Sequence, residues 1–472
     1  MTTPVPVSAR AVAAKALVAA VQRFPNLDPQ VLVTSALDPR EARLALAVHR
    51  TTLQRWITIE YLLDRHLRQP MRLLEPALRA VLLTAGAQLL FMDRLPAHAV
   101  VDESVELARH MVRPGAAGVV NAVLRKLAAL VDADAEPDGA GAKSRHAHAG
   151  LAWQPAPDRL PLNDGVRPLR EPCLPSLDQL DRHLSVATSH PVALVRRWIA
   201  SFGRAQAITV CGHGTLTPPT IVAGLPTPGP SPGMPRSGGL PGIAADAFVP
   251  HEQAGFAVWQ GTHEQLVAAL HEHPQARVQD PGAARAVAAC ASLQPRVILD
   301  YCAGRGTKTR QLAIQHPQAQ IIAAEVDAAR LTALRESVAG LANVQVTGIS
   351  QLDKTMAGRL ADLIVLDVPC SNTAVLARRP EARYRFSSAS MEQLIALQRQ
   401  IITRALTFAA PDAHILYSTC SLEPEENAQQ VRWITQQGKA RVIDELQTLP
   451  AGYATTYHDG AYHALLRQRQ SV

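Results

Sequence analysis

The stretch Val297-Ile-Leu-Asp-Tyr-Cys-Ala-Gly-Arg-Gly-Thr-Lys-Thr309 decides the fold of the C-terminal half of the chain. It starts with a short apolar run, passes through a turn that contains Gly304 and Gly306, and continues with a helical pattern. Glycine permits a tight turn and a close approach of a ligand to the backbone, and a helix N-terminus favours anionic groups. The stretch therefore predicts a strand, a ligand-binding turn and a helix in succession.

Three kinds of ligand compete for a turn of this type. A phosphate-binding P-loop requires glycine where Thr307 stands, and a dinucleotide-binding turn requires its third glycine where Thr309 stands. The D-x-x-x-G-x-G turn that is common in S-adenosylmethionine sites is matched by Asp300, Gly304 and Gly306. The turn thus favours S-adenosyl-L-methionine, although by itself it is only moderately specific.

Apolar β-rich runs alternate with helical stretches from about residue 296 onward. The runs are Val297–Leu299, Ile321–Ala324, Leu363–Leu366 and Ile415–Tyr417, and Met391–Ala409 is one of the helical stretches. This alternation predicts a mostly parallel, doubly wound sheet, which binds ligands at the carboxyl ends of its strands.

Acidic residues end the second of these strands. Glu325 and Asp327 follow the glycine turn by about 20 residues, where a carboxylate accepts hydrogen bonds from ribose hydroxyls. Glu325 lies nearer the strand end and is the preferred candidate. The alternative interpretation is an exposed acidic loop.

Two cysteines follow two further strands of the predicted sheet. One strand ends in Asp367-Val-Pro-Cys370 and the other in Thr419-Cys420, after which Pro424, Glu425 and Glu426 predict the start of a helix. An isolated thiol is usually a small buried hydrophobe. Two thiols at the same sheet edge as a cofactor-binding turn instead indicate a role in catalysis.

The N-terminal part of the chain has a different texture. Residues 8–130 show only helical patterns, with an apolar stripe in the segment from Glu75, and predict a helical bundle of the first 130 residues. Residues 131–180 are rich in proline, alanine and glycine and predict a linker. Residues 181–277 form a predicted connecting region with a helix over Leu180–Ala207 and a Pro/Gly-rich loop, and residues 278–472 form the sheet domain.

Charge and composition narrow the class of protein further. The net charge is +7, and residues 1–130 carry 16 basic against 10 acidic residues, which points to a polyanionic partner such as nucleic acid. A solvated basic face is the alternative interpretation of that charge. The six cysteines show no metal-ligand spacing, and we find neither a secretory signal nor a bilayer-spanning run. We therefore expect a cytoplasmic protein without a metal or a membrane association.

At this point the sequence resembles the RsmB (Sun/Fmu) branch of the bacterial ribosomal RNA cytosine-5 methyltransferases. The family motifs D-A-P-C-S and Y-x-T-C-S-x-x-P-E-E-N correspond to Asp367–Ser371 and Tyr417–Asn427. Segments similar to its NusB-like domain and its connecting region are Leu74–Arg79, Gln88–Pro96, Asn121–Arg125, Ser189–Pro191 and Arg196–Trp198. The resemblance implies an all-α NusB-like bundle followed by a Rossmann-like α/β methyltransferase domain.

The resemblance also implies a reaction and its residues. By this resemblance, Cys420 is the nucleophile that adds to C6 of a cytosine, and Cys370 assists release of the adduct. We expect the Asp367 carboxyl to hydrogen-bond the base edge and stabilise the adduct, and capping of the following turn is the alternative. The partner is RNA, with small-subunit ribosomal RNA or a ribosomal-subunit precursor expected, and the chain is expected to be a monomer. Expected contacts of S-adenosyl-L-methionine are Cys302, Ala303, Gly304, Arg305, Gly306, Thr307, Lys308, Glu325 and Asp367.

The chain departs from the family pattern at two places. Arg305 and Thr307 replace Pro and Gly of the usual C-A-A-P-G-G-K turn, and Ile349 replaces the acid after Gly348. Asp353 and Ser350 are candidates to replace the missing acid. These departures leave open a second hypothesis, an RNA-binding ribosome-assembly factor with a weakened cofactor site.

A basic loop with an aromatic residue follows the first cysteine motif. Such a loop can bind phosphates and stack an unpaired base, although a solvated loop is an alternative. The residues expected to contact RNA are Arg378, Arg379, Arg383, Tyr384 and Arg385.

Overall fold

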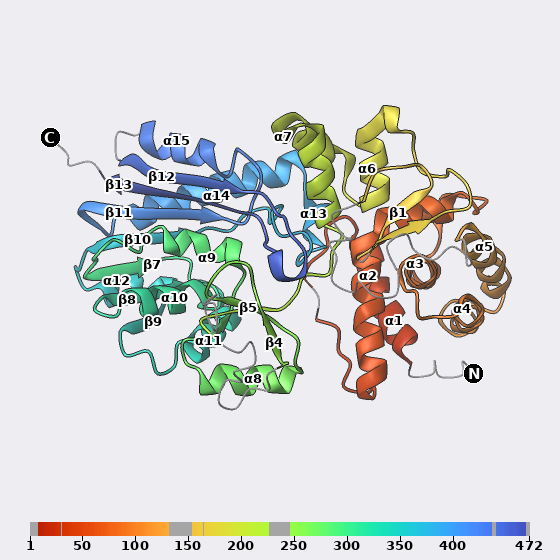
Figure 1. Ribbon diagram of the computed structural model, residues 1–472, viewed down its shortest axis with the longest axis horizontal. Coiled ribbons are helices and arrows are strands. Elements are labelled where there is room, and N and C mark those ends of the chain that lie inside the picture. Colours follow the sequence, from red (N-terminus) through yellow and green to blue (C-terminus); the bar gives the residue numbers. More distant parts are fainter. Residues whose placement is uncertain are drawn as a thin grey trace, which may run out of the picture. The chain divides into compact units, whose positions relative to one another are not determined.

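A computed structural model describes residues 8–29, 31–131, 153–163, 165–225, 246–436 and 440–468 (Figure 1). Contacts divide the chain into two compact units. The first, called the helical unit here, comprises the residues up to Thr217 together with the segment Leu376–Phe386. The second, the sheet unit, comprises Pro218–Val375 and Ser387–Val472.

Five helices form the core of the helical unit, in agreement with the predicted bundle. They are α1 (Ala9–Arg23), α2 (Pro39–Asp64), α3 (Pro76–Phe91), α4 (Ala97–Met111) and α5 (Ala116–Leu130). The sequence predicted one apolar stripe on α3, yet the helix is buried on nearly every side because α1, α2, α4 and α5 all pack against it. Gly86 permits the approach of α2, since a Cβ there would lie 2.5 Å from Ile59 Cγ2.

The predicted linker 131–180 is wrong over its described C-terminal part. Strands β1 (Arg159–Pro161) and β2 (Val166–Pro168) form an antiparallel pair, and Trp153 and Cys173 are buried in the unit. Trp153 stacks on His183, Val131 and Leu169 form a backbone bridge, and Arg167 donates to the carbonyl of Leu90. These partners are distant in sequence, so local composition does not reveal them. Residues 132–152 lie outside the described part of the chain.

The predicted connecting region is divided between the two units. Helices α6 (Leu180–Thr188) and α7 (Val192–His213) belong to the helical unit, as does α13 (Ala382–Arg385). The rest forms a small antiparallel sheet of the sheet unit, in the order β4-β5-β3-β6, with helix α8 (His263–Glu272). Its strands are β3 (Ile221–Ala223), β4 (Phe248–Pro250), β5 (Phe256–Trp259) and β6 (Arg277–Val278).

A seven-stranded sheet forms the centre of the sheet unit, with the strand order β12-β13-β11-β10-β7-β8-β9 (Figure 1). The strands are β7 (Val297–Asp300), β8 (Gln320–Glu325), β9 (Val344–Gly348), β10 (Ala361–Asp367), β11 (Ala409–Thr419), β12 (Ala440–Thr448) and β13 (Ala461–Gln468). The five strands from β7 to β11 run parallel, and β13 pairs antiparallel with both β11 and β12. The mostly parallel sheet that the sequence predicts is therefore confirmed.

Helices cover both faces of this sheet because successive strand residues alternate between the faces. Ile298 and Val365 pack on the side of α9 (Pro281–Ala288) and α10 (Thr307–Gln315), with α11 (Ala328–Ser337) beside them. The opposite face packs against α12 (Leu352–Met356), α14 (Ser388–Leu406) and α15 (Ala428–Gln436). None of the helices in the described ranges combines the length and the hydropathy needed to cross a membrane.

Candidate active site at the carboxyl ends of the strands

The glycine turn between β7 and α10 adopts a conformation that requires its glycines. Gly304 and Gly306 have φ angles of +58° and +89°, in the left-handed region that side chains disfavour. A Cβ on Gly306 would lie 2.8 Å from Leu334 Cδ1 of α11. Arg305 and Thr307, which replace the family residues, are both exposed. Their side chains therefore leave the fold of the turn intact.

Glu325 closes this turn from the end of β8. Its carboxylate accepts hydrogen bonds from the backbone N–H of Gly304 at 3.0 Å, of Val326 at 3.0 Å and of Asp327 at 2.9 Å. The guanidinium of Arg330 lies 3.7 Å away. The residue expected to bind ribose thus also fixes the backbone of the glycine turn. Arg330 is a neighbour that the sequence did not single out.

Asp300 lies fully buried at the end of β7. Its Oδ2 accepts a hydrogen bond from the Thr309 hydroxyl at 2.7 Å, whereas Oδ1 has no partner among the described residues. Burial raises the pKa of Asp300 to about 7, and the nearby charge of Asp367 adds to that effect, while the Thr309 hydroxyl and Lys308 oppose it. An unpaired buried acceptor beside a glycine turn is suited to a ligand with a donor group.

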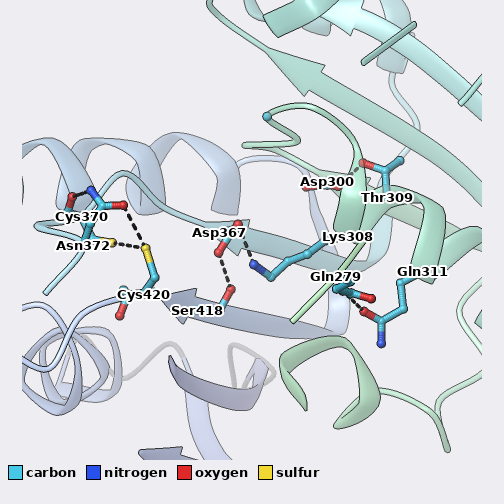
Figure 2. A network of polar contacts seen from close by, with 12 residues as sticks. Gln279, Asp300, Lys308, Thr309, Gln311, Asp367, Cys370, Asn372, Ser418 and Cys420 are labelled. Carbon is cyan, nitrogen blue, oxygen red and sulfur yellow. Dashed lines mark hydrogen bonds and ion pairs between the residues drawn. The ribbon is translucent and has the colours of Figure 1, made fainter. Parts of the chain in front are cut away.

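Lys308 and Asp367 form an ion pair, with Nζ 2.7 Å from Oδ2 (Figure 2). Burial alone would lower the pKa of Lys308, but the charge and the hydrogen bond of Asp367 outweigh it, so the pKa is raised and the ammonium stays charged. The other oxygen of Asp367 accepts a hydrogen bond from the Ser418 hydroxyl at 3.0 Å. This arrangement links α10, β10 and β11.

The two strand-end thiols lie side by side. Cys370 Sγ and Cys420 Sγ are 3.2 Å apart, and both cysteines are free and half-buried (Figure 2). The side chain of Asn372 lies beside them, with Oδ1 3.2 Å from Cys420 Sγ and Nδ2 2.8 Å from the carbonyl oxygen of Cys370. Asn372 has a φ angle of +61°, which asparagine tolerates better than most residues. Sequence reasoning missed Asn372, although it stands two residues after the first cysteine.

Two cysteines near the site, Cys370 and Cys302, are kept protonated by their surroundings. The hydrogen bond with Cys420, together with burial, raises the pKa of Cys370 well above its usual value, so Cys370 remains a thiol. Burial also raises the pKa of Cys302, and the carboxylates of Asp300 and Asp367 add to this shift. Neither residue is therefore poised as a thiolate in the free protein.

A buried carboxylate connects the loops that carry the two thiols. Glu426 accepts hydrogen bonds from Ser371, Ser421 and Gln398. The predicted helix start at residues 424–426 is wrong, because these residues form a turn and α15 begins at Ala428. The P-E-E-N motif contains Glu426 and could have singled it out. Acidic residues in the first turn of a helix are normally exposed, so the motif by itself does not reveal that Glu426 is buried among hydrogen-bond donors.

The predicted RNA-contacting loop is wrong for two of its residues. Arg383 and Tyr384 are 0% and 3% exposed, because they are packed into the helical unit, where the Tyr384 hydroxyl donates to the carbonyl of Leu53 at 2.7 Å. Arg378 and Arg385 are partly exposed, and Arg379 is exposed. The segment Leu376–Phe386 belongs to the helical unit, so sequence proximity to Cys370 does not make these residues part of one site.

The two candidates to replace the missing acid after β9 lie at the surface, and their role remains a prediction. Ile349 is partly buried against the core of the sheet unit, and Ser350 is exposed. Asp353 forms an ion pair with Arg404 at 2.5 Å. Both side chains of this ion pair are largely exposed, so the pair holds Asp353 only weakly.

Comparison with known proteins identifies the family to which the chain belongs. A family model described as 16S rRNA methyltransferase RsmB/F matches residues 289–461, and the NusB family model matches residues 7–129. A ribosomal RNA small subunit methyltransferase B from Xanthomonas campestris is 30% identical over 90% of this chain and 87% of its own length. The chain belongs to the RsmB/F family of 16S rRNA methyltransferases. The resemblance stated from the sequence is confirmed.

Further relatives support this family and its fold. The protein of the same name from Pasteurella multocida is 27% identical over 98% of this chain and 96% of its own. The crystal structure of PH0851 has a TM-score of 0.66 at 16% identity, covering 98% of this chain and 100% of that chain. The chain is an RNA cytosine-5 methyltransferase of the RsmB/F family, with S-adenosylmethionine as its methyl donor.

The residues of the site fit S-adenosylmethionine. Asp300 Oδ1 offers a buried acceptor without a partner among the described residues, which suits an ammonium group. Glu325 Oε2 accepts one hydrogen bond from Gly304, and a carboxylate oxygen has room for a second donor such as a ribose hydroxyl.

Proposed function

We propose that this RsmB/F family member methylates C5 of a cytosine in small-subunit ribosomal RNA, with Cys420 as the nucleophile. The observation that carries the proposal is the pair of thiols 3.2 Å apart, next to the Lys308–Asp367 ion pair at the same sheet edge as the glycine turn. We further propose that the protein acts as a monomer in the cytoplasm, on ribosomal RNA or on a precursor of the small subunit.

Each side chain takes a role that its surroundings support. The thiolate of Cys420 adds to C6 of the cytosine, which places electron density on C5. Bound S-adenosylmethionine supplies the methyl group on its sulfonium centre. C5 then carries the methyl group and a proton. The C5 proton passes to water, and the electron pair of the Cys420–C6 bond returns to the sulfur of Cys420. Cys370, kept as a thiol by its surroundings, assists this release by donating a hydrogen bond to the departing Cys420 thiolate.

We propose that Asp367 binds the cytosine base and that Lys308 contributes positive charge to the site. The Asp367 carboxylate accepts from Lys308 and Ser418, and its remaining acceptor positions suit the amino edge of cytosine. The Lys308 ammonium supplies a positive charge at the strand ends that carry Asp367 and Cys420. The target base must leave its stack to reach the thiol, so we expect a cytosine in a single-stranded or loop region.

Cysteine variants test the assignment of the two thiols. We expect Cys420→Ala to abolish both methylation and any covalent protein–RNA link, since the attacking sulfur is lost. We expect Cys370→Ala to attack and then stall, because release fails after methyl transfer. The stalled species is a protein–RNA adduct that requires S-adenosylmethionine and survives denaturing electrophoresis.

The outcome separates the proposed roles from their alternatives. Methylation by Cys420→Ala would contradict the assignment, and an adduct that accumulates in that variant would reverse it. A melting curve of each variant controls for misfolding, which lowers both signals together. Bisulfite sequencing of small-subunit ribosomal RNA with and without the protein identifies the cytosine. If the wild type does not bind S-adenosylmethionine, the alternative function of an RNA-binding ribosome-assembly factor is favoured instead.

A further inference from the structure

Glu426 is the most completely buried carboxylate near the thiols that the methyl-transfer reaction does not use. Its side chain is 0% exposed. It lies in the turn between β11 and α15, six residues after Cys420 in sequence. A buried carboxylate is costly unless hydrogen bonds compensate for its lost hydration.

The partners of Glu426 come directly after the two cysteines. Ser371, which follows Cys370, donates its backbone N–H to Oε1 at 2.9 Å and its hydroxyl to Oε2. Ser421, which follows Cys420, donates its hydroxyl to the same Oε2. One carboxylate therefore holds both cysteine loops, which are 50 residues apart in sequence.

A third element completes the set of donors. Gln398 of α14 donates from Nε2 to Glu426 Oε1 at 3.0 Å and to the carbonyl of Pro369 at 2.9 Å. Four donor groups thus point at the two oxygens of Glu426. An ionised carboxylate only accepts hydrogen bonds, and its two oxygens have about four acceptor sites. A glutamine at this position would direct its own N–H groups at donors.

We propose that Glu426 is a positioning residue for methyl transfer, whose carboxylate fixes the Cys370 and Cys420 thiols at the spacing that the reaction requires. The inference rests on the proposed function of the two thiols. It explains why two loops from different strands keep their sulfurs within hydrogen-bond distance, although the contact between two thiols is itself weak. Gln398 supports the same arrangement through Pro369, the residue before Cys370.

The spacing of the thiols can be measured without RNA. Dibromobimane becomes fluorescent when both of its arms have reacted with thiols, and peptide mass spectrometry identifies the linked pair. We expect the wild type to form the Cys370–Cys420 cross-link and Glu426→Gln to form it at least about tenfold more slowly, since hydrogen bonds to a charged group order such a loop strongly. Glu272→Gln is the matched control. It removes one exposed carboxylate of the same unit, at the end of α8, which packs on the small antiparallel sheet.

The rate of methyl transfer is the second readout. We expect Glu426→Gln to lower the single-turnover rate about 100-fold or more, because an ångström of misplacement costs a reaction that order of magnitude. The KM for RNA should stay within about twofold, since Glu426 is buried and does not contact the substrate. Glu272→Gln should match the wild type in both quantities.

Ser371→Ala and Ser421→Ala keep the test decisive if Glu426→Gln fails to fold. Each removes one hydroxyl donor to Glu426 and leaves the carboxylate in place, so each should reduce cross-linking and rate in the same direction. Wild-type rates and cross-linking in all of these variants would overturn the inference. A change in only one of the two readouts would also overturn it, because spacing and rate would then be independent.

The same experiment separates this inference from the proposed function. If the wild type forms the cross-link in a Glu426-dependent way but methylates no cytosine, the proposed function fails and the positioning of the thiols stands. If the wild type methylates while Glu426→Gln is unchanged in both readouts, only the inference fails.

Discussion

The carboxyl groups near the carboxyl ends of the strands differ in the hydrogen bonds and ion pairs that replace their hydration. The carboxylate of Glu426 is surrounded by donors, and that of Asp367 is paired with Lys308. Asp300 has a hydroxyl on one oxygen and nothing on the other among the described residues. Burial raises the pKa of both Glu426 and Asp300; the hydrogen bonds from Ser371, Ser421 and Gln398 oppose this effect at Glu426, whereas the pKa of Asp300 reaches about 7.

The raised pKa of Asp300 predicts how cofactor affinity depends on pH. Burial raises this pKa to about 7, so the carboxylate is present above pH 7 and is lost as the pH falls below that value. If Oδ1 binds the ammonium of S-adenosylmethionine, calorimetry should show the affinity fall by up to about tenfold per pH unit below 7. Asp300→Asn should bind more weakly at pH 8 and show little change down to pH 6. A wild-type affinity that is constant over this range would contradict the prediction.

Among the elements, the segment Leu376–Phe386 departs furthest from its place in the sequence. It lies between β10 and α14 of the sheet unit, yet its contacts are those of the helical unit. The Arg383 guanidinium donates to carbonyl oxygens of helices and turns in that unit, namely those of Gln54, Thr188, Ser189, Gly214 and Leu376. These bonds, at 2.8–3.3 Å, explain why a basic residue in a loop is fully buried.

Arg383 is therefore predicted to stabilise the helical unit rather than to bind RNA. Arg383→Ala should destabilise that unit by about 3 kcal/mol or more, because it leaves a cavity and five carbonyl oxygens without this donor. Urea unfolding followed by tryptophan fluorescence measures the change, since Trp56, Trp153 and Trp198 lie in this unit. Arg379→Ala, an exposed position of the same segment, is the control and should stay within about 0.5 kcal/mol of the wild type. Equal stability of both variants would show that the buried guanidinium contributes nothing.

The positive charge of the whole molecule is concentrated in its N-terminal helices. Of the net charge of +7, residues 1–130 carry +6. The structure adds that residues 153–163 and 165–217 pack with those helices in one unit, so an N-terminal fragment that ends at residue 130 would expose surface that is covered in the full chain. RNA binding is therefore best measured on the full chain.

RNA affinity of the full chain should fall steeply as salt is added. Each phosphate contact that releases a counterion contributes about 0.7 to the slope of log affinity against log salt for single strands. Filter binding of an unstructured RNA between low and moderate salt gives that slope, and we expect it to correspond to several contacts. Sodium glutamate in place of chloride controls for specific anion effects. An affinity that is independent of salt would mean that the basic face is only solvated surface.

The sequence by itself predicted four of the seven strands of the large sheet, the glycine turn and the position of the two thiols at strand ends. The glycine turn, the alternation of strands and helices, and the two cysteine motifs are short-range patterns, and their periodicity depends on nearby residues alone. Glu325, Asp367, Cys370 and Cys420 all lie at the carboxyl ends of strands, as the pattern predicted. The mostly parallel class of the sheet followed as well, and parallel strands joined by helices bring those ends to one edge. The strand order and the antiparallel pairing of β13 came only from the structure.

Only the tertiary structure decided which polar residues face solvent and which hold the site together. Arg383 looked like a solvated loop cation and is buried, and Glu426 looked like an exposed first-turn acid and bonds to Ser371, 55 residues away in sequence. Burial of a charge depends on partners supplied by distant segments, and no local pattern encodes those partners. A buried guanidinium and a buried carboxylate are tolerated here because other parts of the chain supply the carbonyl oxygens and hydroxyl groups that replace their water.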